Sequence, residues 1–375
     1  MKKIFFLMLL FFPIVIFADQ NMTSAKSSIL MEYKTGKILY ENNTKERLAP
    51  ASMTKIMSML LIMEQIDSGK LKLDDEVLIS ENAAKMGGSQ IFLSAGSKMK
   101  VNELLKGVAI ASGNDAVVAL AEKTHGSVDK FVIKMNEKAN DLGLINTNFK
   151  NPHGLDEEGH YSCAYDMAVM ARELINHESI LNYTKIYEEY LTKEDGSKTW
   201  LVNTNKLVRF YDGVDGLKTG YTTQAEYCLT ATAKKDDLRF IVVVMGEPDN
   251  DTRTKDTANL LNYAFNSYQL NKIIKKDQKV DVLKNNKTIK NKYYVYTALD
   301  LDDVVEINSD VSYSNPYITY EDLDYPIKKN SIVGYLKYQT NNDILSVPLI
   351  VKEDVKIATF KDYFIMNLKR LLGIK

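Results

Sequence analysis

One apolar stretch, Leu48 to Met63, constrains the fold more than any other part of the chain. Pro50 stands where a helix would begin, and no glycine or proline follows until Gly69, so the sequence predicts a turn that leads into a buried helix. Ser52 and Lys55 lie inside this stretch, and a helix would place both side chains on one face with their Cβ atoms about 5–6 Å apart.

This spacing has a chemical meaning, because a serine hydroxyl attacks well only when a base takes its proton, and a lysine can be that base only when it is neutral. The neighbouring Met and Leu side chains supply a dry setting that would lower a lysine pKa from about 10.4 to about 7–8, which corresponds to about 4 kcal/mol. The alternative is a capped helix with a lysine whose ammonium reaches solvent, and one Ser-x-x-Lys alone favours that alternative.

Two further motifs follow in order, Ser112-Gly113-Asn114 and Lys218-Thr219-Gly220. The ordered set Ser-x-x-Lys, Ser-Asp-Asn and Lys-Thr-Gly is found in penicillin-binding proteins and class A β-lactamases, and glycine here takes the middle place of the second motif. A second Lys-Thr-Gly, at residues 34–36, precedes Ser52 and separates two short predicted strands. We interpret it as a hairpin turn with a solvated lysine and no chemical role.

The remaining periodicity predicts strands early, helices in the middle, strands late and a closing helix. This order is typical of an α+β domain in which one sheet combines both chain ends and carries an inserted helical lobe. The expected helices cover residues 101–111, 115–142, 166–175 and 252–268, and the expected late strands cover 213–220, 226–233 and 238–245.

Composition and the chain ends indicate an exported protein. The formal net charge of −1 gives no nucleic-acid footprint. Residues 1–18 read as a signal peptide, with two lysines, a short apolar run and a small residue at Ala18. Because an exported chain with only Cys163 and Cys228 is not a disulfide scaffold, we expect two free, buried thiols, and the alternative is a single bridge between them.

Four segments are expected after the signal peptide: a main domain at 24–268, a lysine-rich linker at 269–279, a small all-β domain at 280–356 and a helix at 359–375. In the last segment, apolar residues share one face and basic residues surround the other. A basic amphipathic helix at a chain end is typical of anchoring on a membrane surface, and the alternative is packing on its own domain.

The chain resembles the serine D-alanyl-D-alanine carboxypeptidases, which are low-molecular-mass penicillin-binding proteins. The resemblance spans roughly residues 28–268, and the β domain and terminal helix fit the same layout. It implies a β-lactamase/transpeptidase-like domain with an antiparallel sheet, no cofactor and no metal. The strings that carry it are Ala49-Pro-Ala-Ser-Met-Thr-Lys55, Ala111-Ser-Gly-Asn-Asp-Ala116, Asn151-Pro-His-Gly-Leu-Asp156, Tyr161-Ser-Cys-Ala-Tyr-Asp-Met167 and Val214-Asp-Gly-Leu-Lys-Thr-Gly220.

The resemblance also implies catalytic roles. Ser52 would attack the carbonyl between the two terminal D-alanines of a peptidoglycan stem peptide, and Lys55 would take its proton. Ser112 would relay a proton to the leaving amine, with Lys218 holding that relay electrostatically. Asn114 would bond Lys55 or the substrate amide. Water would then release the acyl-enzyme, and β-lactam antibiotics would acylate the same serine.

Substrate-binding roles follow from the same resemblance. Backbone N–H groups of Ser52 and Tyr221 would form the oxyanion hole. Thr219 and Arg253 would hold the terminal carboxylate, since a guanidinium suits a planar anion. Lys218 and Gly220 belong to the same binding strand.

His153 lies at a loop that shapes the cleft in similar proteins, and its alternative role is a turn residue that bonds backbone. Relatives often carry histidine or another polar residue where this chain has Tyr221.

Three other functions compete with this interpretation. A β-lactamase of the same fold would need a deacylating glutamate, usually in a Glu-x-x-Leu-Asn pattern. Glu178-Ser-Ile-Leu-Asn182 has this pattern, but it lies far from Ser112 along the chain, unlike the spacing in a β-lactamase. A zinc peptidase would need paired histidines, and the four histidines form no such motif. A non-catalytic cell-wall binding protein would bind without releasing D-alanine. We therefore expect a carboxypeptidase at the outer face of the cytoplasmic membrane.

Overall fold

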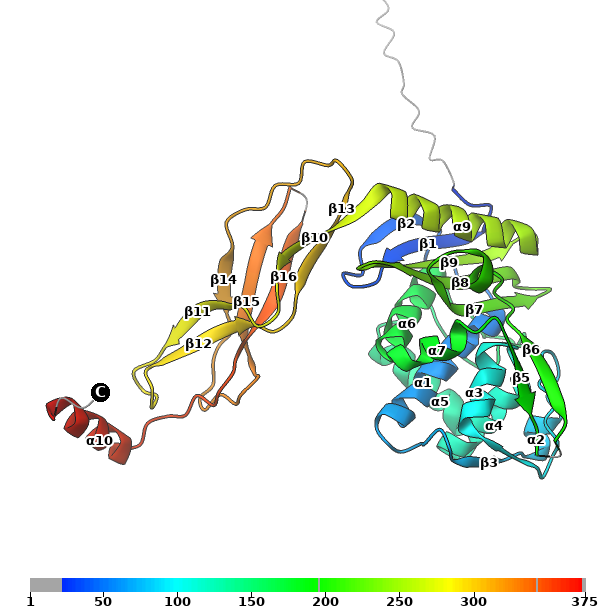
Figure 1. The fold of residues 1–375 in the computed structure, drawn as a ribbon, viewed down its shortest axis with the longest axis horizontal. Helices are drawn as coiled ribbons and strands as arrows, with labels where there is room; N and C mark the ends of the chain where they lie inside the picture. Colours follow the sequence, from blue (N-terminus) through cyan, green and yellow to red (C-terminus); the bar gives the residue numbers. More distant parts are fainter. Residues whose placement is uncertain (1–21, 195, 342, 373–375) are drawn as a thin grey trace, which may run out of the picture.

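The computed structural model describes residues 22–194, 196–341 and 343–372, so the expected signal peptide at 1–18 lies outside the described residues. Figure 1 shows a broad α/β body followed by a slender β body and a short terminal helix. This agrees with the fold class expected from the sequence.

A five-stranded antiparallel sheet with strand order β2-β1-β9-β8-β7 forms the frame of the first body. Strand β1 is buried along its whole length and pairs with β9, so the two ends of this body meet in one sheet, as predicted. The strands are β1 (Ser27–Glu32), β2 (Ile38–Asn42), β7 (Val214–Thr222), β8 (Glu226–Lys235) and β9 (Leu238–Glu247).

The helical lobe lies on one face of this sheet and α9 on the other (Figure 1). Helix α1 is buried from Lys55 to Met63, in agreement with its continuous apolar run. The helices are η1 (Ala51–Thr54), α1 (Lys55–Asp67), α2 (Glu81–Ala84), α3 (Val101–Ala109), α4 (Asn114–His125), α5 (Val128–Asp141), α6 (Ala164–Asn176), η2 (Glu178–Ile180), α7 (Leu181–Thr184), α8 (Leu207–Phe210) and α9 (Asn250–Ser267).

The helical pattern expected at 115–142 is two helices instead of one. Gly126 adopts φ +81° and ends α4, a left-handed conformation that glycine takes without a Cβ penalty. Ser127 then caps α5, since its side chain accepts a hydrogen bond from the Lys130 N–H.

Two small strand pairs were not expected from the sequence. Strands β3 (Glu76–Leu78) and β4 (Lys98–Lys100) pair at the edge of the lobe. Strands β5 (Glu188–Thr192) and β6 (Lys198–Val202) form a longer hairpin that leads back toward β7.

Both cysteines are free and buried, which confirms the expectation. Cys163 precedes α6, and its Sγ accepts the Asp166 N–H. Cys228 lies on β8 opposite Gly220.

The second body is an all-β domain, but the expected linker at 269–279 is wrong. Most of those residues form β10 and the start of β11. Their lysines are exposed, whereas Ile274 is buried in the core of the β domain. Strand β10 (Tyr268–Ile274) pairs with β13 (Leu301–Glu306). The other strands form a sheet of order β11-β12-β16-β15-β14, with β11 (Lys279–Lys284), β12 (Lys292–Thr297), β14 (Tyr317–Tyr320), β15 (Ile332–Gln339) and β16 (Ile344–Val351).

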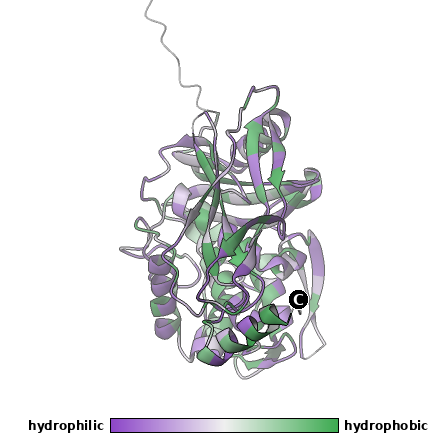
Figure 2. Ribbon diagram, turned by 90° about the vertical axis from the view of Figure 1, so that its left-hand side faces the viewer, coloured by the Kyte–Doolittle hydropathy of each residue, from purple (hydrophilic) through white to green (hydrophobic). Residues whose placement is uncertain are grey.

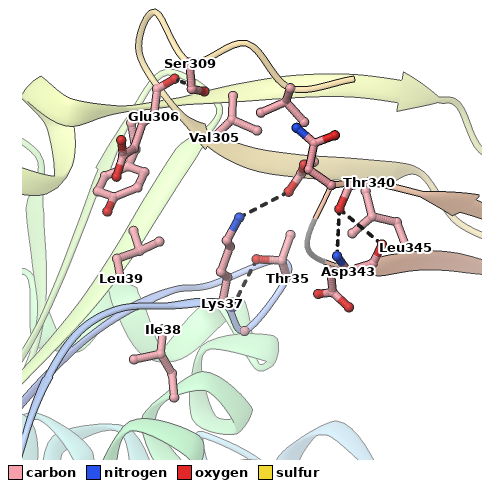
Figure 3. Close-up of a pocket in the computed structure, with 15 residues that line it drawn as sticks. Thr35, Lys37, Ile38, Leu39, Val305, Glu306, Ser309, Thr340, Asp343 and Leu345 are labelled. Carbon is pink, nitrogen blue, oxygen red and sulfur yellow. Dashed lines mark hydrogen bonds and ion pairs between the residues drawn. The ribbon is translucent and has the colours of Figure 1, made fainter. Parts of the chain in front are cut away.

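The turn at residues 34–36 lies at the junction of the two bodies. Lys34 is not merely solvated, because its Nζ lies 2.9 Å from Asp302 Oδ2 on β13. Lys37 donates to the Val304 carbonyl at 2.7 Å and lies 3.6 Å from Asp303. A cavity of about 720 Å³ opens beside these contacts, and Figure 3 shows the Lys37 side chain reaching across it toward β13.

Helix α10 (Phe360–Leu371) follows the β domain and exposes large apolar side chains, among them Phe360, Phe364 and Leu371. Figure 2 shows this helix with hydrophobic and hydrophilic stretches near the C-terminus. In the part of the chain that the structure describes, no helix has both the length and the apolar content needed to cross a bilayer.

Candidate active site

Ser52 lies in the short helix η1, which turns directly into α1 at Lys55. Ala51, just before it, adopts φ +45°. A non-glycine residue with positive φ is strained and is found preferentially at functional sites. The Lys55 Nζ lies 2.9 Å from Ser52 Oγ, 2.7 Å from Asn114 Oδ1 and 2.8 Å from the His153 carbonyl oxygen.

Lys55 is completely buried, and burial is the main reason why its pKa falls well below the ordinary lysine value. The positive charge of Lys218 lowers the pKa of Lys55 further, and the carboxylate of Asp115 partly opposes this effect. The structure therefore provides the dry setting that the sequence predicted around this amine.

The second motif lies at the beginning of α4. Ser112 adopts φ +62°, and its Oγ is buried without a hydrogen-bond partner among the described residues. Asn114 donates from Nδ2 to the Gly87 carbonyl at 2.7 Å and from its backbone N–H to the Ser89 carbonyl at 2.7 Å. A Cβ on Gly88 would lie 2.7 Å from the Asn114 amide, so this glycine allows the loop to hold Asn114 closely.

Asp115 is a positioning residue that the sequence analysis missed. Its buried carboxylate accepts the backbone N–H groups of Ile91 and Leu93, each at 3.1 Å, and fixes the loop that binds Asn114. Its place directly after Asn114 was the only available signal, because the acceptor role depends on a loop more than twenty residues away.

The third motif lies on β7, where Lys218 and Thr219 are buried. Burial first, and then the charge of Arg253, lower the pKa of Lys218 to about 7. The Thr219 hydroxyl donates to Thr204 Oγ at 2.7 Å. A Cβ on Gly220 would lie 2.7 Å from the Pro50 carbonyl oxygen, so this glycine lets β7 approach the turn before Ser52.

Arg253 and Tyr221 differ in exposure. Arg253 lies in the first turns of α9, is buried, and its Nε has no hydrogen-bond partner among the described residues. Tyr221 is 56% exposed, and its ring lies 4.4 Å from that of Tyr227 on the neighbouring strand. A buried guanidinium with an unused donor is suited to receive an anion.

The loop at 151–156 packs directly on the Ser52 turn. The His153 carbonyl accepts from Lys55, while its ring Nδ1 accepts the Leu155 N–H at 3.2 Å. Burial is the main cause that lowers the pKa of His153 to about 3, so the ring is neutral. Gly154 has φ +88°, and a Cβ there would lie 1.8 Å from the Ala51 carbonyl oxygen.

His160 is a second residue that the sequence analysis missed. Its Nδ1 accepts the Lys150 N–H at 3.0 Å, so its Nε2 carries the proton and donates to the Thr54 hydroxyl at 2.8 Å. This hydrogen bond fixes Thr54, which lies between Ser52 and Lys55 in the chain and close to Gly154 in the loop at 151–156.

The other candidates lie apart from this cluster. Glu178, the possible deacylating glutamate of a β-lactamase, is exposed in η2 and acts electrostatically on Tyr33. Within residues 22–194, 196–341 and 343–372, no group of three or more His, Cys, Asp or Glu side chains is placed to hold a metal ion.

Comparisons with known proteins point to one family. Residues 15–249 match the D-alanyl-D-alanine carboxypeptidase family model, and residues 268–357 match the penicillin-binding protein 5 C-terminal domain. The chain is 50% identical to D-alanyl-D-alanine carboxypeptidase DacF of Bacillus subtilis over 93% of this chain and 89% of that protein. It is 35% identical to DacC of Escherichia coli, over 94% and 90%. The crystal structure of penicillin binding protein 5 from Haemophilus influenzae matches with a TM-score of 0.77 and 31% identity, covering 89% of this chain and 98% of that one.

Proposed function

Because the chain belongs to the D-alanyl-D-alanine carboxypeptidase family of low-molecular-mass penicillin-binding proteins, we propose that it trims the last D-alanine from peptidoglycan pentapeptides through an acyl-enzyme on Ser52. The carboxypeptidase activity and penicillin binding belong to the family. The substrate and the role of each residue are the proposal.

The single observation that carries it is the set of three oxygens around Lys55 Nζ. A neutral amine has two N–H donors and one lone pair. The oxygens of Asn114 and His153 can only accept, so they use both donors, and the lone pair is left for the Ser52 hydroxyl. This arrangement supports Lys55 as the base that takes the Ser52 proton.

The proton then needs a route to the leaving amine. Ser112 is suited to relay it, since its Oγ is buried without a hydrogen-bond partner among the described residues, and it lies two residues before Asn114, which contacts Lys55. Lys218 would stabilise the relay by its charge, and Asn114 would orient Lys55 through the 2.7 Å contact. When the D-alanine has left, water would attack the ester on Ser52 and the same groups would act in reverse.

Substrate binding is assigned to β7 and α9. Backbone N–H groups of Ser52 and Tyr221 would stabilise the oxyanion. The unused Nε of Arg253, together with Thr219, would bind the terminal carboxylate. His153 would contribute through its carbonyl oxygen and the shape of its loop, because its ring is neutral.

The cellular location is also a proposal. Residues 1–18 would direct export, and the apolar side chains that α10 exposes would insert into the outer face of the cytoplasmic membrane. A chain that ends at residue 358 should no longer bind vesicles of anionic lipid and should keep its activity. Binding of the shortened chain as tight as that of the full chain would contradict the anchor.

The test of the function combines two measurements on one sample. After penicillin treatment, mass spectrometry should find one covalent adduct on Ser52, and none in Ser52→Ala. The untreated protein should release D-alanine from a peptide that ends in D-Ala-D-Ala. Fast penicillin hydrolysis without an adduct would favour a β-lactamase, and an intact peptide substrate would favour a non-catalytic binding protein.

A further inference from the structure

The hairpin formed by β5 and β6 exposes two large aromatic side chains side by side. Tyr190 and Trp200 are direct cross-strand neighbours and are 63% and 58% exposed. The next residues along the two strands, Leu191 and Leu201, are buried because alternate residues of a strand point to opposite faces. The inner face therefore anchors the hairpin on the lobe, and the outer face presents the aromatic pair to solvent.

The base and tip of this hairpin are tied to the segments that build the active site. After β6 the chain reaches Thr204, whose hydroxyl accepts from Thr219 of the third motif at 2.7 Å. At the tip, the Lys193 ammonium donates to the Phe92 carbonyl at 2.7 Å. Phe92 belongs to the loop that also holds Asn114 through Ser89. The hairpin thus runs along one border of the site.

Phe92 adds a third exposed aromatic at the tip. It is 66% exposed and adopts φ +58°, a conformation that costs energy for a bulky residue. The Asp115 carboxylate maintains it by accepting the N–H groups on either side, from Ile91 and Leu93. Strained backbone of this kind clusters at functional sites.

The distance from the hairpin to the active site is compatible with the length of the substrate's stem peptide. Trp200 lies four residues before Thr204, a separation of at most about 13 Å, since β6 ends at Val202. The four stem residues before the cleaved bond span at most about 14 Å when extended. The group attached to the other end of the stem peptide is the sugar chain, so that chain can reach the hairpin while the peptide occupies the site.

We propose that the outer face of this hairpin, formed by Tyr190 and Trp200, binds the uncharged N-acetylated sugar rings of the peptidoglycan strand. This inference rests on the proposed function, because it uses the same substrate. Flat indole and phenol rings stack on the C–H faces of pyranose rings, and their polar edges tolerate water. The exposed Thr192 and Lys198 flank the pair on the same face and can hydrogen-bond to sugar hydroxyls and acetamides.

Trp200 supplies its own probe, since it is the one tryptophan of the chain. Oligomers of N-acetylglucosamine, which carry the acetamide but no charge, should shift its emission to the blue with a saturable dependence on concentration. The sugar-free peptide diacetyl-Lys-D-Ala-D-Ala should not. A flat oligosaccharide titration would overturn the proposal. An emission shift that follows protein concentration without ligand would point to a second copy of the chain and would also overturn it.

The kinetic test is the ratio of kcat/KM for a disaccharide-pentapeptide to kcat/KM for the sugar-free peptide. In Trp200→Val this ratio should fall about two- to tenfold, because valine keeps the strand and removes the stacking surface. Tyr294→Val, which removes a 51% exposed aromatic on β12, should leave the ratio unchanged. An unchanged ratio in Trp200→Val would mean that the aromatic pair only stabilises the hairpin. A wild-type protein that cannot cleave the sugar-free peptide would instead contradict the proposed function, and the oligosaccharide titration would still decide the sugar site.

Discussion

The chain contains the same tripeptide, Lys-Thr-Gly, in two places with opposite properties. At residues 34–36 it forms a turn at the junction of the two bodies, where the ion pair with Asp302 raises the pKa of Lys34. At residues 218–220 it lies in a buried strand, where burial lowers the pKa of Lys218 to about 7. The surroundings of the lysine, and not the tripeptide, therefore determine its chemistry.

The two glycines differ in the same way. Gly36 has φ +74° and makes the turn possible, whereas Gly220 allows the Pro50 carbonyl to come close to β7. The two threonines also differ, since Thr35 hydrogen-bonds to Glu32 within its turn and Thr219 bonds to Thr204 in another segment. Local sequence explains the first copy, and long-range packing explains the second.

The largest difference between the two Lys-Thr-Gly copies is expected when the lysine of each copy is replaced by methionine. Lys218→Met should lower the rate constant for penicillin acylation about 100- to 1000-fold, because it removes a buried charge at the reacting groups. Lys34→Met should leave acylation within about twofold. Equal losses in both variants, measured by stopped-flow acylation, would contradict the assignment of the second copy as the catalytic one.

The next largest effect is expected at Arg253, the proposed partner of the substrate's terminal carboxylate. Arg253→Ala should lower kcat/KM for a D-Ala-D-Ala peptide about 10- to 100-fold, the value of a charge-assisted hydrogen bond that is lost at a buried site. Arg253→Lys should recover part of this loss. A peptide amidated at its C-terminus should show little difference between wild type and Arg253→Ala, and a large difference would argue against a carboxylate contact.

A smaller contrast is expected for the two glycines. Gly220→Ala should destabilise the protein by about 1–3 kcal/mol and slow acylation, since its Cβ meets the Pro50 carbonyl beside the Ser52 turn. Gly36→Ala should cost about 1 kcal/mol through its positive φ, with acylation unaffected, because its Cβ meets only the end of the Arg172 side chain. Denaturant unfolding and acylation rates of both variants check this, and slowed acylation in Gly36→Ala would break the comparison.

The smallest effect is expected at the junction itself. Lys34→Ala should change the free energy of unfolding by at most about 1 kcal/mol, because the Lys34 side chain is 43% exposed and salt screens the pair with Asp302. Unfolding curves at low and high salt measure it. A loss of several kcal/mol would show that this turn holds the two bodies together more strongly than its exposure indicates.

The sequence predicted the motif residues because each motif is local, and their order along the chain indicated a common site. It did not predict how Asp115 and His160 hold that site, since each acts through a backbone group or hydroxyl far from it in sequence. The expected linker at 269–279 is strand instead, because its pairing with β13 depends on residues 301–306. The β5–β6 hairpin was missed for a different reason, because its alternating pattern is only five residues long on each strand.

The most direct test of a neutral Lys55 as the base for Ser52 is the pH dependence of penicillin acylation, followed by mass spectrometry of the adduct. The base must be deprotonated, so the rate should rise with pH through the lowered pKa of Lys55, far below the ordinary lysine range. Loss of the Lys218 proton, at its pKa of about 7, should oppose this rise on the alkaline side. A rate that climbs steadily to about pH 10.4, the range of an unperturbed lysine, would contradict the account.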